Sequence, residues 1–311
     1  MTDSWNGRPL DGCLFEGAPA AAPMLTLAGG GDLPRRVDLR PHCSPVEDQR
    51  QTNSCVANAI VGALELHQRK AGMAPVDMSR LFLYWNARSI TKNEANDNGS
   101  FIHHGMAAVL AFGVCEERMW PFEEAMVRAQ PTDACFKNAT SYEAIQFART
   151  PRGEPAMAAL AQGLPVAFGI VLPSECYQVA GQTGTVPNPE TIQVNSAPSG
   201  HAMLIVGYDL EEKVYIVRNS WGAGYGQNGY LNIPFEVMER HAHPDQFWTI
   251  GAIEQSKGLG MFGPSVAESV EKVAGGMMSN EALDRLRGEL RGSLNNRLET
   301  SRQGFARRLR E

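Results

Sequence analysis

The chain has 311 residues, of which 43% are hydrophobic and 20% are charged, and its formal net charge is −6. This length and hydrophobic content are sufficient for a buried core in about one to two domains. The modest acidic charge predicts neither a nucleic-acid nor a membrane-surface partner. No apolar run approaches the roughly 18 residues that a membrane-spanning helix needs.

Residues 1–36 are rich in Ala, Pro and Gly and include the turn-forming run Gly29-Gly30-Gly31. The first eight residues contain neither a basic start nor a following hydrophobic core, so no secretory signal is visible. A cytoplasmic protein, or one exported without a visible signal peptide, is therefore expected. We interpret residues 1–36 as either an unstructured leader or a short pro-segment in a cleft of the next domain, with residues 24–27 docking most firmly.

The region from residue 37 to about residue 150 is predicted to be mainly helical. Residues 55–70 are apolar on nearly all sides, carry basic side chains near their end and are followed by Gly72, which together predict a buried central helix. Shorter helical patterns follow at residues 79–89 and 104–112.

The region from about residue 151 to residue 255 has a different pattern and is predicted to be rich in strands. Its apolar runs have strand length and are separated by Gly-rich turns. The expected strands are residues 164–171, 202–207, 214–218 and 230–233.

Residues 256–311 form a C-terminal extension that is predicted to be helical from about residue 279. Leucines recur there at helical spacing, namely Leu283, Leu286, Leu290, Leu294 and Leu298. Such a stripe fits a helix that packs on its own domain, a partly unstructured tail, or a surface for self-association or partner docking.

Cysteines and histidines are the candidate metal ligands of the chain. The six cysteines include no Cys-x-x-Cys pair and no zinc-finger spacing. The pairs His103-His104 and His241-x-His243 have no further ligand close to them in the sequence. Neither a metal nor another cofactor is therefore expected.

Three residues stand in the order and context that nucleophilic catalysis by a thiol requires. Cys55 opens the central helix, His201 opens a strand-like run 146 residues later, and Asn219 begins Asn219-Ser220-Trp221-Gly222. A spacing of about 130–150 residues is typical of a thiol nucleophile and its downstream histidine base. A helix N-terminus and an adjacent imidazolium both stabilise a thiolate, and the imidazole can then carry the proton.

The sequence around these residues resembles the papain family of cysteine peptidases, in particular its bacterial, xylellain-like members. The resemblance rests on residues 45–49 before the cysteine and on residues 199–208 and 217–230 around the histidine and the asparagine. It implies an α+β fold of two lobes with the active-site cleft between them. The peptidase domain would span residues 37–255, with the helical lobe ending and the β-rich lobe beginning near residue 150.

The resemblance also implies roles for individual residues. Asn219 would orient the ring of His201, Trp221 would shelter that hydrogen bond, and Gln49 would donate to the oxyanion together with the backbone N–H of Cys55. The residues implied in substrate binding are Gly99 and Ser100 through their backbone, and Gly169, Gly200 and Ala202 as a pocket lining.

The chain departs from the family pattern at two positions that carry a disulfide in most relatives. Thr52 and Asp97 stand where the two bridged cysteines would be, and Val56 replaces the usual tryptophan after the nucleophile. Neither change affects the proton chemistry. The pairing of the remaining cysteines stays open; these are Cys13, Cys43, Cys115, Cys135 and Cys176.

The sequence thus predicts an endopeptidase that hydrolyses protein or peptide substrates through an acyl-enzyme thioester. A deamidase or another acyl-transfer enzyme could use the same residues, because a fold does not determine a substrate. A catalytically idle binding scaffold is the third interpretation, and the complete set of catalytic residue types argues against it.

Overall fold

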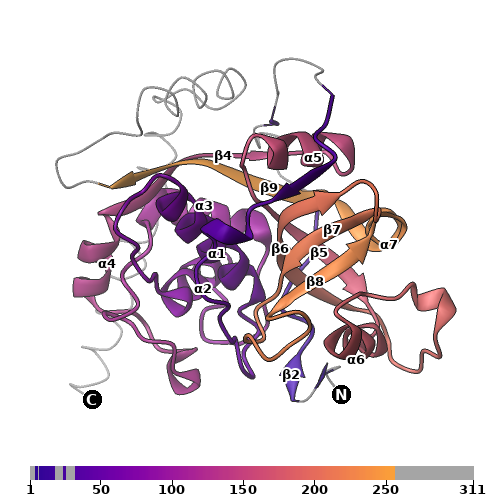
Figure 1. The fold of residues 1–311 in the computed structure, drawn as a ribbon. Coiled ribbons are helices and arrows are strands. Elements are labelled where there is room, and N and C mark those ends of the chain that lie inside the picture. Colours follow the sequence, from indigo (N-terminus) through magenta and orange to yellow (C-terminus); the bar gives the residue numbers. More distant parts are fainter. Residues whose placement is uncertain (1–3, 6, 18–23, 26–31, 256–311) are drawn as a thin grey trace.

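A computed structural model describes residues 4–5, 7–17, 24–25 and 32–255 of the chain. The C-terminal extension, including the helix predicted from about residue 279, lies outside the described residues. Within the described part, helices gather in one lobe and an antiparallel sheet forms the other (Figure 1). The α+β, two-lobe prediction is confirmed.

The helical lobe is built around α1, which spans Cys55–Lys70. All its residues from 55 to 68 are buried, as expected of a helix that is apolar on nearly every side. Helix α2 (Arg80–Ser89) begins at the N-cap Ser79, whose side chain accepts the backbone N–H of Phe82. Helix α3 (Ile102–Phe112) packs against α2 and α1, and α4 (Asp133–Ala139) lies at the edge of this lobe (Figure 1).

The second lobe is a seven-stranded antiparallel sheet. Its strand order is β4-β9-β5-β6-β7-β8, and β3 pairs with the C-terminal end of β6. The strands are β3 (Arg36–Asp38), β4 (Tyr142–Arg149), β5 (Val166–Leu172), β6 (Ser199–Asp209), β7 (Val214–Arg218), β8 (Tyr230–Pro234) and β9 (Ala242–Gln255). The continuous apolar sequence of β5 is explained by its central place, because it pairs with β6 and β9 and is covered on both faces.

The sheet extends further toward the N-terminus than the sequence pattern suggested. A helical region reaching about residue 150 was expected, but β4 already pairs along its length with β9. An edge strand such as β4 is stabilised by pairing with a strand that is distant in the chain. Its local sequence therefore predicts only weakly that it belongs to the sheet. The lobes are therefore joined through β4 and β9.

Further helices cover the sheet lobe and were not predicted. Helices α5 (Glu154–Ala161) and α6 (Ser174–Thr183) lie at opposite ends of it, and α7 (Phe235–His241) packs beside β8 (Figure 1). Helix α6 ends at Gly184, whose φ of 76° is the left-handed conformation that glycine adopts most easily. Short 3₁₀ turns occur at Arg40–His42, Glu124–Met126 and Pro189–Thr191.

The described N-terminal residues are packed on the rest of the molecule. Strands β1 (Ser4–Trp5) and β2 (Arg8–Pro9) form a small hairpin near α6. Residues 10–17, called the covering segment below, then pass over the start of α1, and Leu10 and Cys13 are buried there. Of the part expected to dock, Leu25 is buried and donates its N–H to the carbonyl of Arg149 on β4. In the described part of the chain, no helix combines the length and the apolar character needed to cross a membrane.

Candidate active site

Cys55 is the first residue of α1, where the unpaired backbone N–H groups of a helix point. Its Sγ accepts the backbone N–H of Ala202 on β6 at 3.4 Å, which places the sulfur beside the strand that carries His201. Burial raises the pKa of the thiol to about 12, and hydrogen bonds from the backbone of Ala202, Val56 and Cys55 itself act in the opposite direction. The backbone hydrogen bonds therefore favour the thiolate of Cys55, whereas its burial favours the neutral thiol.

His201 and Asn219 are brought together although 18 residues separate them. Nε2 of His201 lies 2.8 Å from Oδ1 of Asn219. The same Oδ1 accepts the backbone N–H of Ser220 at 2.9 Å, which identifies it as the acceptor oxygen of the amide. Nε2 must then carry a hydrogen, and Nδ1 is left as the nitrogen that can exchange a proton.

The imidazole of His201 is completely buried. Its Nδ1 has no hydrogen-bond partner among the described residues. Burial lowers the pKa of His201 to about 4, and the hydrogen bond with Asn219 raises it by a smaller amount. In this structure the ring is accordingly neutral at physiological pH.

Two aromatic rings pack against the imidazole of His201. The ring of Trp221 stacks on His201 with centroids 4.9 Å apart and an interplanar angle of 29°. Tyr177 of α6 contacts both rings edge-on, at 5.7 Å from His201 and 5.3 Å from Trp221. Trp221 thus stacks on the ring whose hydrogen bond it was expected to shelter. Tyr177 was missed because nothing in the sequence near residue 177 marks it.

Gln49 lies on the loop before α1 and is fully buried. Its Nε2 donates to the carbonyl of Thr52 at 2.7 Å, and its Oε1 accepts the hydroxyl of Ser220 at 2.6 Å. A side-chain amide has two N–H donors, so one remains after the bond to Thr52. Ser220, which the sequence did not single out, holds both Gln49 and Asn219 in orientation.

Hydrogen bonds join the loops that a disulfide joins in most relatives. Asn53, next to Thr52, donates its backbone N–H to Oδ1 of Asp97 at 3.0 Å and its side-chain amide to the carbonyl of Asp97 at 2.7 Å. The hydroxyl of Tyr84 donates to the same carboxylate at 2.7 Å. All six cysteines of the chain are described and are free thiols. A partly buried polar network therefore stands where the resemblance would place a disulfide.

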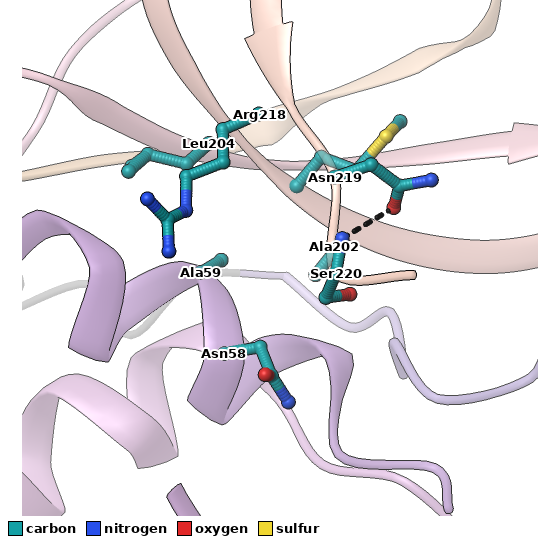
Figure 2. A pocket seen from close by; sticks show the side chains of 8 residues that line it. Asn58, Ala59, Ala202, Leu204, Arg218, Asn219 and Ser220 are labelled. Carbon is teal, nitrogen blue, oxygen red and sulfur yellow. Dashed lines mark hydrogen bonds between the residues drawn. The ribbon is translucent and has the colours of Figure 1, made fainter. Parts of the chain in front are cut away.

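A small cavity lies on the interior side of Asn219, between α1 and the sheet (Figure 2). Its volume is about 10 Å³, close to the minimum that a single water molecule requires. Figure 2 shows Asn58 and Ala59 of α1 facing Arg218, Asn219 and Ser220 across it. This cavity is too small for a peptide, and Cys55 is not among the residues that line it.

The thiol of Cys55 lies beneath the covering segment. A Cβ atom placed on Gly12 would stand 2.6 Å from Sγ of Cys55. Ser100 donates its backbone N–H to the carbonyl of Gly12 at 3.0 Å and accepts the N–H of Leu14 at 3.1 Å. The segment therefore pairs with Ser100 as a short parallel strand, directly over the thiol.

The side chains of the covering segment lie on the other residues expected to bind substrate. A Cβ on Gly169 would stand 2.6 Å from the ring of Phe15 and 3.0 Å from Sγ of Cys13, and a Cβ on Gly200 would stand 2.4 Å from Phe15. Cys13 also donates its N–H to the carbonyl of Gly200 at 3.0 Å. Gly99 has the carbonyl of Gly12 against it, and Ala202 contacts the thiol.

A helical lobe and a sheet lobe, with a helix-start cysteine beside a strand histidine that is bonded to an asparagine, define the class of papain-like cysteine peptidases. The chain belongs to this family: residues 33–242 match the model of the papain family of cysteine proteases. It is a cysteine peptidase and therefore a hydrolase.

Individual relatives agree with this assignment. The chain is 31% identical over 231 residues to the uncharacterized peptidase C1-like protein L477 of Acanthamoeba polyphaga mimivirus, covering 70% of this chain and 72% of that protein. It is 29% identical over 217 residues to human cathepsin L2, covering 65% of this chain and 61% of the cathepsin. Its structure is similar to that of xylellain, a cysteine protease from Xylella fastidiosa, with a TM-score of 0.72, 28% identity, and coverage of 83% of this chain and 100% of xylellain.

Proposed function

We propose that the chain is an endopeptidase in which Cys55, His201 and Asn219 act as a triad and residues 10–17 restrain the activity. The observation that carries the proposal is the 2.8 Å contact between Nε2 of His201 and Asn219, which leaves Nδ1 for the thiol proton. The thiol of Cys55 accepts the backbone N–H of Ala202, which is the residue after His201 on the same strand.

In the proposed reaction, Nδ1 of His201 takes the proton of Cys55 and Sγ attacks the carbonyl carbon of the scissile peptide bond. The carbonyl oxygen becomes an oxyanion. When the C–N bond breaks, the imidazolium gives its proton to the leaving amine and a thioester remains on Cys55. His201 then takes a proton from water and the water oxygen attacks the thioester. Cleavage of the C–S bond releases the acid, and the imidazolium returns its proton to the departing sulfur, which restores the thiol and the neutral imidazole.

The oxyanion would be stabilised by two donors, one at the first residue of α1 and one on the loop before it. These are the backbone N–H of Cys55 and the remaining N–H of the Gln49 amide. Hydrogen bonds with Thr52 and Ser220 hold the amide of Gln49 in one orientation. One such preorganised donor is typically worth about 3–4 kcal/mol in the transition state.

The covering segment would act as a restraint because it takes the place of a substrate. Its backbone bonds to Ser100 and its side chains rest on Gly169 and Gly200, which are the residues that we expect a peptide to use. It also lies against Sγ of Cys55, and burial at the site keeps the thiol protonated and the imidazole of His201 neutral. A segment of the same chain has a high effective concentration, so weak contacts suffice.

The test compares the full chain with a chain that begins at Leu33. Both are assayed with a fluorogenic peptide, and the labelling of Cys55 by iodoacetamide is followed by mass spectrometry. We expect the shorter chain to cleave the peptide and to be labelled faster, and Cys55→Ala to abolish cleavage without unfolding. Cys43→Ala, which removes a half-buried thiol outside the site, is the matched control and should retain activity.

The alternatives predict different results. Fast labelling of Cys55 in the shorter chain without cleavage of any peptide would point to a deamidase or another acyl-transfer enzyme. Labelling as slow as that of an ordinary thiol in both chains would point to an idle scaffold. Peptide cleavage that survives Cys55→Ala would overturn the assignment of the nucleophile.

A further inference from the structure

Two histidines and a carboxylate meet where the covering segment crosses α3. His103 and His104 are consecutive residues of α3, and Glu16 belongs to the covering segment. One ligand atom from each lies within 4.8 Å of the other two. Nε2 of His103 is 3.1 Å from Oε1 of Glu16. No third ligand for the histidine pair was expected, because Glu16 is 87 residues away in the chain.

The surrounding residues hold these three groups in position. Phe101 packs on both imidazoles, with ring centroids 5.3 Å from His103 and 4.9 Å from His104. The backbone carbonyl of Glu16 accepts a hydrogen bond from Nε2 of Gln246 at 2.9 Å. The two histidines and Glu16 are thus each held by contacts with neighbouring residues.

The chemistry of the three groups suits a transition-metal ion. Imidazole binds metals in its neutral form, and one ring nitrogen of each histidine and a carboxylate oxygen of Glu16 lie near one another. Nδ1 of His103 is buried and has no hydrogen-bond partner among the described residues. Two imidazole nitrogens and one carboxylate oxygen are a donor set that zinc accepts, with a fourth position left for water.

The distances are close to those that zinc requires. Ligand atoms about 2.0–2.2 Å from a tetrahedral zinc ion lie roughly 3.5 Å apart, somewhat closer than the upper limit of 4.8 Å in the cluster. The side chain of Glu16 is 51% exposed, so its carboxylate can rotate toward the two rings without disturbing the core. Its exposure also allows an ion to enter from the solvent.

We propose that Glu16, His103 and His104 form a zinc site that fastens the covering segment to the helical lobe. Two ligands come from α3 and the third from the segment, so the complete site exists only while the segment is docked. Binding linkage then requires that zinc strengthen docking by the same factor by which docking strengthens zinc binding. The ion would hold the segment over Cys55 from a position three residues beyond Cys13.

The test uses the full chain carrying Cys55→Ser, so that the candidate nucleophile cannot bind the metal and no activity is needed. Co²⁺, a spectroscopic substitute for Zn²⁺, is titrated in, and zinc competition is measured with a chromophoric chelator. We expect one ion per chain with a visible d–d spectrum and without a thiolate-to-metal charge-transfer band. Because the variant is inactive, the result does not depend on the proposed peptidase mechanism.

Variants then locate the ion. Glu16→Gln keeps a hydrogen-bonding group beside His103 but removes the charged ligand, and His104→Gln removes one imidazole. Each should weaken Zn²⁺ binding by about tenfold or more, which is at least the loss seen when supporting residues of metal sites are changed. His243→Gln is the control, because His243 stacks on Phe15 at 5.4 Å but is not one of the three ligands.

A second measurement follows the segment itself. Zn²⁺ should slow limited proteolysis within residues 10–17 of the Cys55→Ser chain, and it should have no such effect on the His104→Gln form. The proposal is overturned if no ion binds, if Glu16→Gln and His104→Gln bind as tightly as their parent, or if the spectrum shows thiolate ligation. It is also overturned if the ion binds at these residues and leaves proteolysis unchanged.

Discussion

The Cα atom of Gly12 lies so close to the thiol of Cys55 that no side chain fits between them. A Cβ atom on Gly12 would stand 2.6 Å from Sγ and 2.8 Å from the backbone carbonyl of Asn53. Real Cβ contacts are essentially never that short, and one of the two opposing atoms belongs to the backbone and cannot move aside. Any larger residue at position 12 must therefore lift the covering segment away from Cys55.

Gly12→Val should activate the full chain. Overpacking of this kind costs about 1–3 kcal/mol, which corresponds to a roughly five- to 150-fold larger fraction of chains with the segment released. The measurement is the rate of iodoacetamide labelling at Cys55, together with peptide cleavage by the uncut chain.

Gly17→Val provides the control for this experiment. A Cβ on Gly17 would have nothing within 4 Å, so its labelling rate should equal that of the unchanged chain. A Gly12→Val chain that is labelled as slowly as the parent would mean that the segment does not protect the thiol in solution.

Removing Arg8 should have a much smaller effect. Its guanidinium bonds the carboxylate of Asp48 through two nitrogens, at 2.6 and 3.3 Å, and so ties β2 to the loop before Gln49. Both side chains are partly exposed, at 21% and 37%, so screening limits such a pair to about 0–1 kcal/mol. Arg8→Ala should raise the labelling rate of Cys55 by less than about fivefold.

Salt provides the check on this prediction. In the unchanged chain, the labelling rate should rise slightly with ionic strength, because an exposed ion pair is screened. In Arg8→Ala this salt dependence should be reduced. A larger effect than that of Gly12→Val would show that the ion pair, and not the steric fit at Cys55, controls docking.

Gln49→Ala, placed in the chain that begins at Leu33, should lower kcat by about 10²–10³ through loss of an oxyanion donor. Ser220→Ala removes only the hydrogen bond that holds Oε1 of Gln49, at 2.6 Å, so a smaller loss of about fivefold is expected from a bond worth roughly 1 kcal/mol.

Alkylation separates this effect from damage to the nucleophile. The reaction of Cys55 with iodoacetamide forms no oxyanion, so Gln49→Ala should leave its rate unchanged while peptide cleavage falls. An equal fall in both rates would indicate that Gln49 supports the position of Cys55 and does not act on the substrate.

The docking of the covering segment over Cys55, called closure below, should depend on pH. It should be strongest between about pH 6.5 and pH 9. Burial lowers the pKa of His201 from 6.5 to about 4, so an exposed His201 binds a proton more readily than a covered one. The closed arrangement therefore loses stability as the pH falls from 6.5 toward 4, by up to about 1.4 kcal/mol per pH unit. Burial raises the pKa of Cys55 from 9.0 to about 12, so closure also weakens above pH 9.

The measurement is the labelling rate of the full chain divided by that of the chain beginning at Leu33, taken from pH 4.5 to 9 with an uncharged reagent. Dividing the two rates removes the intrinsic pH dependence of the reaction between Cys55 and the reagent. The ratio then reports the fraction of chains in which the covering segment is released. This ratio should be lowest between pH 6.5 and 9 and should rise on acidification. A ratio that is constant from pH 8 to pH 4.5 would exclude a contribution from His201.

The local sequence was sufficient for the family, the fold class and most of the elements near the site. The helix that begins at Cys55, the strand that carries His201 and the turn at Asn219 each have a strong local signal: an all-round apolar helix, a continuous apolar strand and a Gly-rich turn. Helices α5, α6 and α7 and the edge strand β4 had weaker patterns, because contacts with distant strands decide their conformation.

Only the tertiary structure decided what covers the site and what supports it. Tyr177 and Ser220 reach His201 and Gln49 across 24 and 171 residues of sequence. Gly12 over Cys55, and Glu16 beside His103, are contacts between a short N-terminal segment and a body that begins tens of residues later. The periodicity of hydrophobic residues in the sequence indicates which face of a helix or strand is buried. It carries no information about which distant residue covers that face.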